Sequence, residues 1–408
     1  MNRAYTQLLR EYLTQFPCVA VIGARQCGKT TLLQSLDSTW RLFDLERGAD
    51  FQAVGDDPDL FLSLHPEKVA IDEAQILPAL FPALRVAIDN HREKTGRFII
   101  TGSSSPRLAH SISESLAGRV GIIEMSPLSW SEVEPTEHPG LVDLLLDSNL
   151  TAPDIVECAR PRGDLRSLTD YWFKGGYPEQ WLKDEPRFRE LWHDQYIKTY
   201  VMRDVARLFP GLNQEKFRIF ARMLGGLTGQ TVNQAEVARA LGVSSPTVRD
   251  YFEIAQGTFL WRSLPSYVHN VTKRAVKHPK GYLRDSGLGH HALRIPDVSA
   301  LLAHPQAGSS WEGMVVEELC RQLEQRGIGF EAYHYRVSGG GEVDLVLEGA
   351  FGLVAVEIKL GQRIRLQSLR GLQGFVKDHG CRFGLVLSNE ERPRMIADNV
   401  AGVPVRCL

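Results

Sequence analysis

The segment Gly23-Ala-Arg-Gln-Cys-Gly-Lys-Thr30 constrains the fold of this 408-residue chain more than any other feature. It follows a continuous apolar run and precedes a helical pattern at residues 31–36. A continuous apolar run is typical of a strand in a parallel sheet that is covered on both faces. Similar runs, most of them separated by helical patterns, occur at residues 40–44, 68–72, 98–101 and 120–124. The sequence therefore predicts a doubly wound α/β domain at the N-terminal end.

The same segment matches the pattern GxxxxGK[ST] in its proper strand-to-helix context. Its glycines allow successive amide groups to point at phosphate oxygens. Lys29 is expected to reach the β- and γ-phosphates, and the Thr30 hydroxyl is expected to bind Mg²⁺. We therefore predict that the chain binds ATP with Mg²⁺, through Gly23, Ala24, Arg25, Gln26, Cys27, Gly28, Lys29, Thr30 and Thr31.

Two further apolar runs end in polar side chains. The run 68–71 is followed by Asp72 and Glu73. We expect Asp72 to hold Mg²⁺ and Glu73 to orient the attacking water or accept its proton. The run that begins at residue 98 ends in three hydroxyl side chains: Thr101, Ser103 and Ser104. These hydroxyls are candidates to reach the γ-phosphate or the attacking water. The alternative is that they belong to a loop that caps the next helix.

Residues 116–119, Leu-Ala-Gly-Arg, precede a strand pattern and the segment Ser126-Pro-Leu-Ser129. Together with GxRxxGKT, the strand ending in DEAQ and the TGSS segment, they resemble the prokaryotic AAA+-type P-loop ATPases that carry a winged helix and a C-terminal restriction-endonuclease-like domain. The resemblance implies nucleotide hydrolysis in a ring of identical subunits, with six as one ring size. It also implies that Arg119 is an arginine finger that completes a neighbour's site; a surface ion pair is the alternative.

The resemblance covers nearly the whole chain and divides it into four parts. We expect a P-loop ATPase core at residues 1–135 and a helical lid at 136–225. A winged helix with a basic segment is expected at 226–284, and a PD-(D/E)xK-like domain at 285–408.

Residues 233–252 have the pattern of a helix-turn-helix, with Gly242 at the turn and Ser244 or Ser245 capping the second helix. The start of such a helix presents polar side chains to DNA bases when it reads sequence. Basic residues also follow at 262–284 and are candidates to track phosphates, although a packing module and a solvated face are the competing interpretations. The residues predicted to contact DNA are Thr247, Arg249, Lys273, Arg274 and Lys277.

The C-terminal part carries Gly341-Glu-Val-Asp344 and, thirteen positions later, Glu357-Ile-Lys359. This arrangement resembles the PD-(D/E)xK nuclease fold. In that chemistry Asp344 and Glu357 bind a second Mg²⁺, Lys359 positions the attacking water, and Glu317 or Glu318 approaches from the preceding helix. The alternative is a degenerate nuclease domain that serves as a binding or assembly module.

Composition excludes several classes of protein. The net charge of −2, from 47 basic and 49 acidic residues, excludes a histone-like binder but not a local basic groove. The six cysteines form no CxxC pair, and no leader or membrane-length apolar run is evident, so we expect a soluble cytoplasmic protein that contacts no membrane. The leading hypothesis is a DNA-stimulated AAA+ motor or helicase-like ATPase. The alternatives are an ATP-gated metal-dependent nuclease and a nucleotide switch that binds a protein partner.

Overall fold

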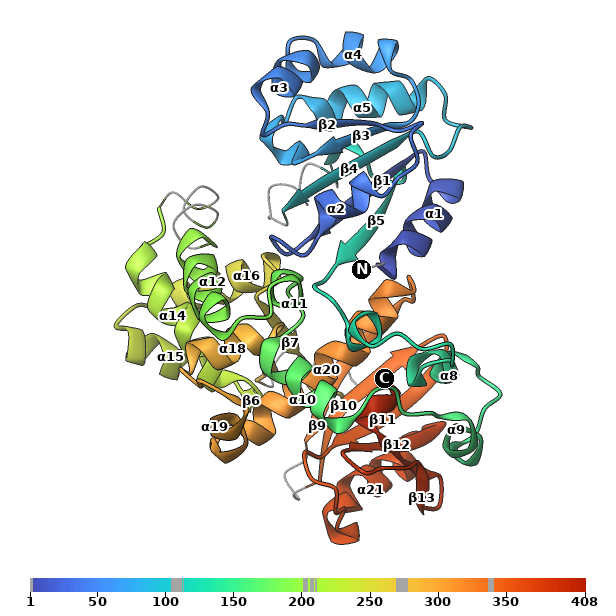
Figure 1. Cartoon of the computed structure of the whole chain (residues 1–408), viewed down its shortest axis with the longest axis vertical. Helices are drawn as coiled ribbons and strands as arrows, with labels where there is room; N and C mark the ends of the chain where they lie inside the picture. Colours follow the sequence, from blue (N-terminus) through green and yellow to red (C-terminus); the bar gives the residue numbers. More distant parts are fainter. Residues whose placement is uncertain are drawn as a thin grey trace. The chain divides into compact units, whose positions relative to one another are not determined.

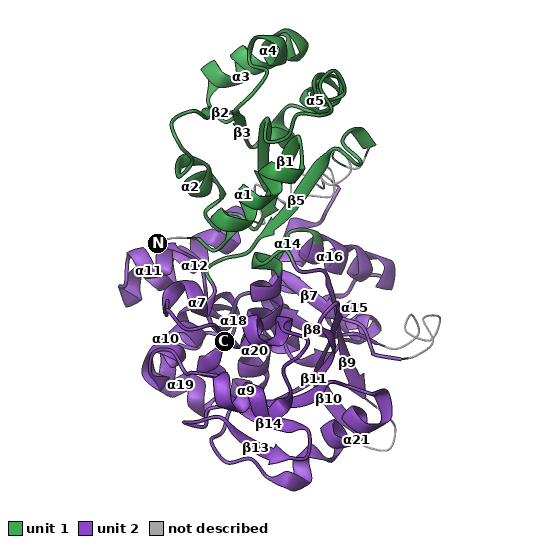
Figure 2. Ribbon diagram, turned by 90° about the vertical axis from the view of Figure 1, so that its right-hand side faces the viewer, with its two compact units in different colours: residues 1–128, 257–259, 324–327 green, residues 129–256, 260–323, 328–408 purple. Residues whose placement is uncertain are grey.

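A computed structural model describes residues 3–103, 112, 114–200, 205, 209, 211–268, 278–336 and 341–408 (Figure 1). The chain divides into two compact units (Figure 2). The first contains residues 1–128, 257–259 and 324–327, and the second contains 129–256, 260–323 and 328–408. The predicted four-part division at residues 135, 225 and 284 is finer than this and stays a prediction.

The first unit is built on a five-stranded parallel sheet in the order β2-β3-β4-β1-β5. Its strands are β1 (Cys18–Gly23), β2 (Arg41–Asp44), β3 (Val69–Asp72), β4 (Phe98–Ser103) and β5 (Val120–Met125). The helices of this unit are α1 (Tyr5–Gln15), α2 (Lys29–Gln34), α3 (Gly48–Gly55), α4 (Pro58–Leu64), η1 (Ala74–Ile76) and α5 (Leu80–Asp89). The predicted α/β fold with a parallel sheet is confirmed, and the predicted strands are correct to within two residues.

The register of this sheet collects the polar strand ends at one edge. Gly23, the last residue of β1, pairs with Ser103 of β4 and with Met125 of β5. Strand β3, which ends at Asp72, pairs in parallel with the other side of β4. Because all these strands run in one direction, the P-loop, Asp72 and Thr101 meet at the carboxyl edge.

The second unit begins with helices, which form most of residues 130–303. They are α7 (Trp130–Val133), α8 (Leu141–Leu146), α9 (Ala152–Cys158), α10 (Leu165–Lys174), α11 (Glu179–Leu182), α12 (Pro186–Thr199), α14 (Gln214–Leu227), α15 (Gln234–Leu241), α16 (Ser245–Gly257), α18 (Ser286–Ala292) and α19 (Val298–Ala303). A break at residues 175–178 separates α10 from α11. Gly175 has a φ of 76°, and an added Cβ would lie 2.4 Å from an oxygen of the buried Asp285, so only glycine fits.

The helix-turn-helix pattern is confirmed by α15 and α16. The Asn233 side chain caps α15, and Gly242 ends it with a φ of 63°. Ser244 accepts a hydrogen bond from the Thr247 amide at the start of α16. A small antiparallel sheet in the order β6-β8-β7 flanks this helix pair: β6 (Gln230–Thr231) precedes α15, and β7 (Trp261–Leu264) and β8 (Lys280–Leu283) come after α16. The sequence did not predict β6 and β8.

The C-terminal part of the second unit is a six-stranded mixed sheet in the order β13-β14-β12-β11-β10-β9. The long helix α20 (Ala307–Gln325) precedes this sheet in the chain. Its buried apolar side chains belong to the same apolar core as those of β10, β11, β12 and β14. The remaining elements are β9 (Phe330–Arg336), β10 (Glu342–Gly349), β11 (Gly352–Ile358), η3 (Leu366–Leu369), α21 (Arg370–His379), β12 (Phe383–Ser388), β13 (Arg394–Ala397), β14 (Val400–Pro404) and η4 (Val405–Cys407).

Among the residues that the structure describes, none of the helices combines the length and the apolar character that a membrane span requires.

Candidate nucleotide site and C-terminal carboxylate cluster

The P-loop connects β1 to α2 through two residues with left-handed backbone. Gln26 has a φ of 58° and Gly28 has a φ of 103°. Gly23 is required for a different reason, because an added Cβ would lie 2.1 Å from the Met125 carbonyl oxygen of the neighbouring strand. The two glycines of the motif therefore allow, respectively, close strand packing and the turn into α2.

Lys29 is 5% exposed and its ammonium contacts the loop itself. Nζ donates to the carbonyl oxygens of Gly23 at 3.2 Å and Ala24 at 2.9 Å. The ammonium therefore lies inside the loop that is expected to bind the phosphates.

Asp72 is the hub of polar contacts at this edge. It is 3% exposed, and its Oδ2 accepts a hydrogen bond from Thr30 Oγ1 at 2.6 Å. Its Oδ1 accepts hydrogen bonds from the Thr101 hydroxyl and from the Glu73 amide. The Thr30 hydroxyl and the Asp72 carboxylate are hard oxygen donors, which is the donor chemistry that Mg²⁺ prefers, so these residues fit a nucleotide-bound Mg²⁺.

Glu73 follows Asp72 with a left-handed φ of 56°, which turns the chain sharply at the end of β3. Its carboxylate accepts a hydrogen bond from the Gln75 amide. Burial raises the pKa of Glu73, and the positive charge of Lys29 opposes that shift. A carboxylate with a raised pKa in this position suits a base that accepts a proton from water.

The other residues predicted to bind nucleotide surround this group. Cys27 and Ala24 are buried, Arg25 and Ser103 are half-buried, and Gln26 and Thr31 are exposed. Ser104 lies outside the described residues. Between the two hydroxyl candidates that the structure describes, Thr101 and Ser103, Thr101 contacts Asp72.

Arg3 is a residue at this site that the sequence did not predict. Its guanidinium donates to the carbonyl oxygen of Cys27 inside the P-loop. It also donates to the carbonyl oxygens of Ser126 at 2.8 Å and Pro127 at 3.4 Å, directly after β5. Arg3 therefore links the P-loop backbone to the segment that leaves the sheet. A lone arginine 20 residues before the motif carries no pattern that could have revealed this.

Arg119 precedes β5 and therefore lies at the amino edge of the sheet, because Val120 pairs with Cys18 at the start of β1. Its Nε and Nη2 donate to the two oxygens of Asp89, at 2.7 Å and 2.9 Å. This hydrogen-bonded pairing lowers the pKa of Asp89. Arg119 thus lies at the edge of the sheet opposite its own P-loop. Within this chain it forms an ion pair with Asp89, which was the alternative to an arginine finger.

The predicted Asp344 and Glu357 share one face of the C-terminal sheet. Leu345 pairs with Val356 across β10 and β11, so the next pair outward places Asp344 opposite Glu357. The Lys359 ammonium forms an ion pair with Glu357. Burial and the Asp344 charge raise the pKa of Glu357. These three residues converge as expected.

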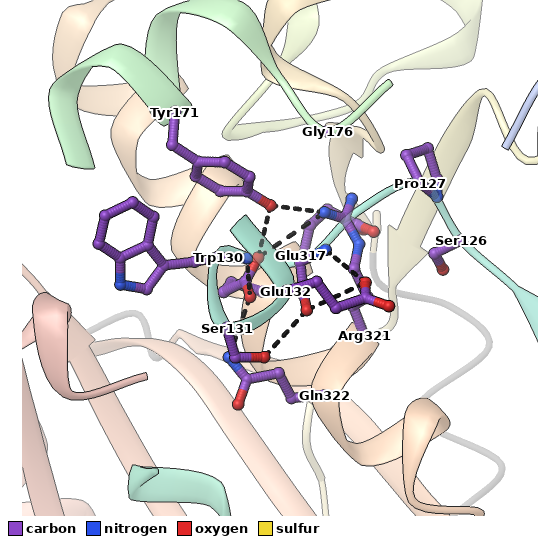
Figure 3. A network of polar contacts seen from close by, with 12 residues as sticks. Ser126, Pro127, Trp130, Ser131, Glu132, Tyr171, Gly176, Glu317, Arg321 and Gln322 are labelled. Carbon is purple, nitrogen blue, oxygen red and sulfur yellow. Dashed lines mark hydrogen bonds and ion pairs between the residues drawn. The ribbon is translucent and has the colours of Figure 1, made fainter. Parts of the chain in front are cut away.

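The prediction that Glu317 or Glu318 joins them is wrong. Glu317 instead pairs with Arg262 and, at 3.2 Å, with Arg284. Glu318 accepts hydrogen bonds from the Trp130 amide and the Tyr171 hydroxyl, each at 2.7 Å. Figure 3 shows Tyr171 and Arg321 turned toward each other in this network, with Trp130 and Gln322 beside them. These neighbouring acids hold α20 to the surrounding segments and serve the packing of the unit.

Glu312, five residues before Glu317 on α20, is the acid that approaches the Asp344 cluster. The Glu312 carboxylate lies 2.6 Å from the Lys280 ammonium. Burial, and secondly the negative charge of Asp344, raise the pKa of Glu312. Lys280 also lies 3.5 Å from Asp344 and 3.3 Å from Glu342. In the part of the chain that the structure describes, no three acidic, histidine or cysteine side chains are arranged to hold a metal ion.

Comparison with known proteins now places the chain. Residues 15–134 match the family model described as "AAA domain", and residues 165–299 and 307–408 match models of two domains of unknown function, DUF8612 and DUF4143. The uncharacterized proteins Rv2008c of Mycobacterium tuberculosis and Mb2031c of Mycobacterium bovis are 34% identical over 97% of this chain and 82% of their own length. The chain belongs to their family.

Among solved structures, the chain is similar to the Walker-type ATPase of Pyrococcus abyssi, with 16% identity over 71% of this chain and 94% of that one and a TM-score of 0.43. The AAA match spans β1 to β5 and so includes the P-loop, Asp72, Glu73 and Arg119. The N-terminal unit is therefore a P-loop ATPase domain of the AAA type.

The residues predicted to contact DNA have separate outcomes. Arg249 on α16 is exposed, and the Thr247 hydroxyl is hydrogen-bonded to Ser244 at 2.8 Å. Lys273, Arg274 and Lys277 lie outside the described residues. Not every basic residue at 262–284 is available to bind phosphates. Three of them form ion pairs with acids of the second unit: Arg262, Lys280 and Arg284.

Proposed function

We propose that this family member is a Mg²⁺-dependent ATPase whose hydrolysis of ATP is coupled to action on DNA, in a ring of identical subunits. The observation that carries the proposal is the group of Lys29, Thr30, Asp72, Glu73 and Thr101 at one edge of a parallel sheet. This is the set that phosphoryl transfer in P-loop ATPases requires: a phosphate cradle, a metal-binding pair and a group that orients water.

Each residue has a role that follows from its contacts. Lys29 exchanges the carbonyl oxygens of Gly23 and Ala24 for phosphate oxygens when the nucleotide binds. Thr30 and Asp72 hold the Mg²⁺, which neutralises phosphate charge when bound. Glu73 orients the attacking water and accepts its proton, and Thr101 fixes the Asp72 carboxylate in place.

The ring is supported by the position of Arg119. Since it precedes β5 at the amino edge, it is at the wrong end of the sheet to serve its own P-loop. An arginine at that edge reaches a nucleotide only when a neighbouring subunit presents its carboxyl edge, as head-to-tail contacts do. In this proposal Arg119 leaves Asp89 and stabilises transition-state charge in the neighbour's site.

Action on DNA is supported by α15, α16 and the small sheet formed by β6, β7 and β8, which together we assign to a winged helix. The start of α16 presents Arg249 and the Ser244–Thr247 pair to solvent. We further assign residues 285–408 to a PD-(D/E)xK-like fold, on the shared face of Asp344, Glu357 and Lys359.

Steady-state ATP hydrolysis by the wild-type chain and a Lys29→Ala variant tests the proposal. We expect the variant to lose turnover and to keep its unfolding transition, since the Lys29 ammonium donates its hydrogen bonds to the loop carbonyl oxygens of Gly23 and Ala24. The matched control is Lys94→Ala, which removes an exposed lysine of the same unit. Equal turnover in wild type and Lys29→Ala would remove the assignment.

A further inference from the structure

The carboxylate cluster of the C-terminal part contains the positively charged side chain of Lys280. Lys280 of β8 is 5% exposed, and its ammonium lies among three carboxylates, 2.6 Å from Glu312, 3.3 Å from Glu342 and 3.5 Å from Asp344. These acids come from α20 and β10, so the ammonium connects the helix to the sheet. All of these residues belong to the second unit.

Several of the carboxylate oxygens that a divalent cation would need are already engaged. The Asp344 oxygen Oδ1 lies 3.5 Å from the Lys280 ammonium. The other oxygen of Asp344, Oδ2, accepts a hydrogen bond from the Ile358 amide at 2.8 Å. Glu312 Oε1 contacts Lys280 and accepts a hydrogen bond from the Tyr282 hydroxyl. Glu357 Oε1 is paired with Lys359, and Glu357 Oε2 is the buried oxygen of the cluster without a hydrogen-bond partner among the described residues.

One such oxygen is too few for a metal site, since Mg²⁺ and Mn²⁺ are bound by several oxygen ligands in a near-octahedral arrangement. The donor types fit a divalent cation, but their arrangement does not, because the Lys280 ammonium lies among the carboxylates of Glu312, Glu342 and Asp344. This is consistent with the absence of a metal-binding set among the described residues.

We propose that Lys280 takes the place of the divalent cation in this nuclease-like cluster, so that the C-terminal part is a metal-independent module that does not cleave DNA. An ammonium compensates the buried carboxylates, but it has no open coordination position with which to polarise a phosphate or activate water. The inference goes beyond ATP hydrolysis and does not depend on it.

Replacing Lys280 tests this directly. In the nucleotide-free full-length chain, Mn²⁺ binding is followed by the loss of the free-ion electron paramagnetic resonance signal. We expect Lys280→Ala to gain one Mn²⁺ site, lost again in Lys280→Ala/Asp344→Asn, and to be stabilised by Mn²⁺ in thermal unfolding. Lys280→Arg, the matched control, keeps a cation in the cluster and should gain no site.

The wild-type chain gives the second measurement, which stands even if Lys280→Ala fails to fold. Its Mn²⁺ titration should be the same as that of Asp344→Asn, and incubation with DNA and Mn²⁺, with or without ATP, should leave the DNA intact. A wild-type Mn²⁺ site that Asp344→Asn removes would overturn the proposal, as would DNA cleavage that Asp344→Asn abolishes. These readouts are independent of ATPase activity, so failure here and failure of the ATPase proposal are distinguishable.

Discussion

Asp72 organises the ATPase site through residues that are far apart in the chain. Thr30 and Thr101 both donate to it, from positions 42 and 29 residues away. The motif spacing predicted the first contact, because the P-loop hydroxyl and the acid after a strand bind the same ion. The second contact depends on β4 lying between β1 and β3, and strand order is a property of the whole sheet that no local pattern encodes.

Glu73→Gln should keep ATP binding and slow hydrolysis by about 10²–10⁴-fold, because it removes the base and leaves the phosphate cradle intact. Because the pKa of Glu73 is raised, the wild-type rate should fall on the acid side at a higher pH than an ordinary glutamate would give. Nucleotide binding by fluorescence and turnover across pH measure the two effects. A Glu73→Gln variant that fails to bind ATP would show that Glu73 belongs to the binding step.

Arg3→Ala should weaken ATP binding by about tenfold, which is about 1.4 kcal/mol, because the P-loop loses the hydrogen bonds that tie it through Arg3 to the Ser126 and Pro127 carbonyl oxygens. Arg10→Ala, on the exposed side of α1, is the control. The dissociation constant of ATP in the two variants is the measurement. Equal affinity would mean that Arg3 has no influence on the P-loop.

At the scale of elements, the buried strands of the parallel sheet were predictable, and the acid of α20 that approaches Asp344 was not. Buried strands have continuous apolar runs, so the runs that predicted β3 and β4 were correct to within two residues. Helix α20 is buried at every position from 313 to 323, so apolar periodicity does not mark one face. The sequence prediction named the two adjacent acids Glu317 and Glu318, whereas in the structure Glu312 contacts Lys280 beside Asp344.

Helix α18 should make the second unit sensitive to acid. Burial lowers the pKa of His290 to about 4, and its ring contacts the Phe173 carbonyl oxygen and Ser310. The unfolded chain takes up this proton near pH 6.5 and the folded chain only near pH 4. Stability should therefore fall as the pH drops through this window, by about 3 kcal/mol for this residue.

Chemical denaturation between pH 7 and pH 4 measures this effect. His290→Gln should flatten the dependence by about that amount, whereas His138→Gln, which changes an exposed histidine, should leave it unchanged. A His290→Gln variant with the wild-type pH dependence would contradict the buried neutral state of this ring.

At the scale of the whole molecule, the ring hypothesis makes Arg119 a residue that acts on a neighbour. Arg119→Ala should keep ATP affinity and lose turnover by about 10³-fold or more. Mixing Arg119→Ala with Lys29→Ala subunits should recover part of the activity, because some interfaces then combine an intact P-loop with an intact arginine. Assemblies shown to be mixed that recover nothing would assign Arg119 to its ion pair with Asp89.

The coupling of ATP hydrolysis to DNA is the central claim, and the steady-state ATPase rate as a function of DNA concentration tests it most directly. The account predicts that DNA raises the wild-type rate and that Arg249→Glu, on the exposed side of α16, weakens this stimulation while leaving the rate without DNA unchanged. A slow rate that is the same at every concentration of single- and double-stranded DNA would contradict the account and indicate a nucleotide switch.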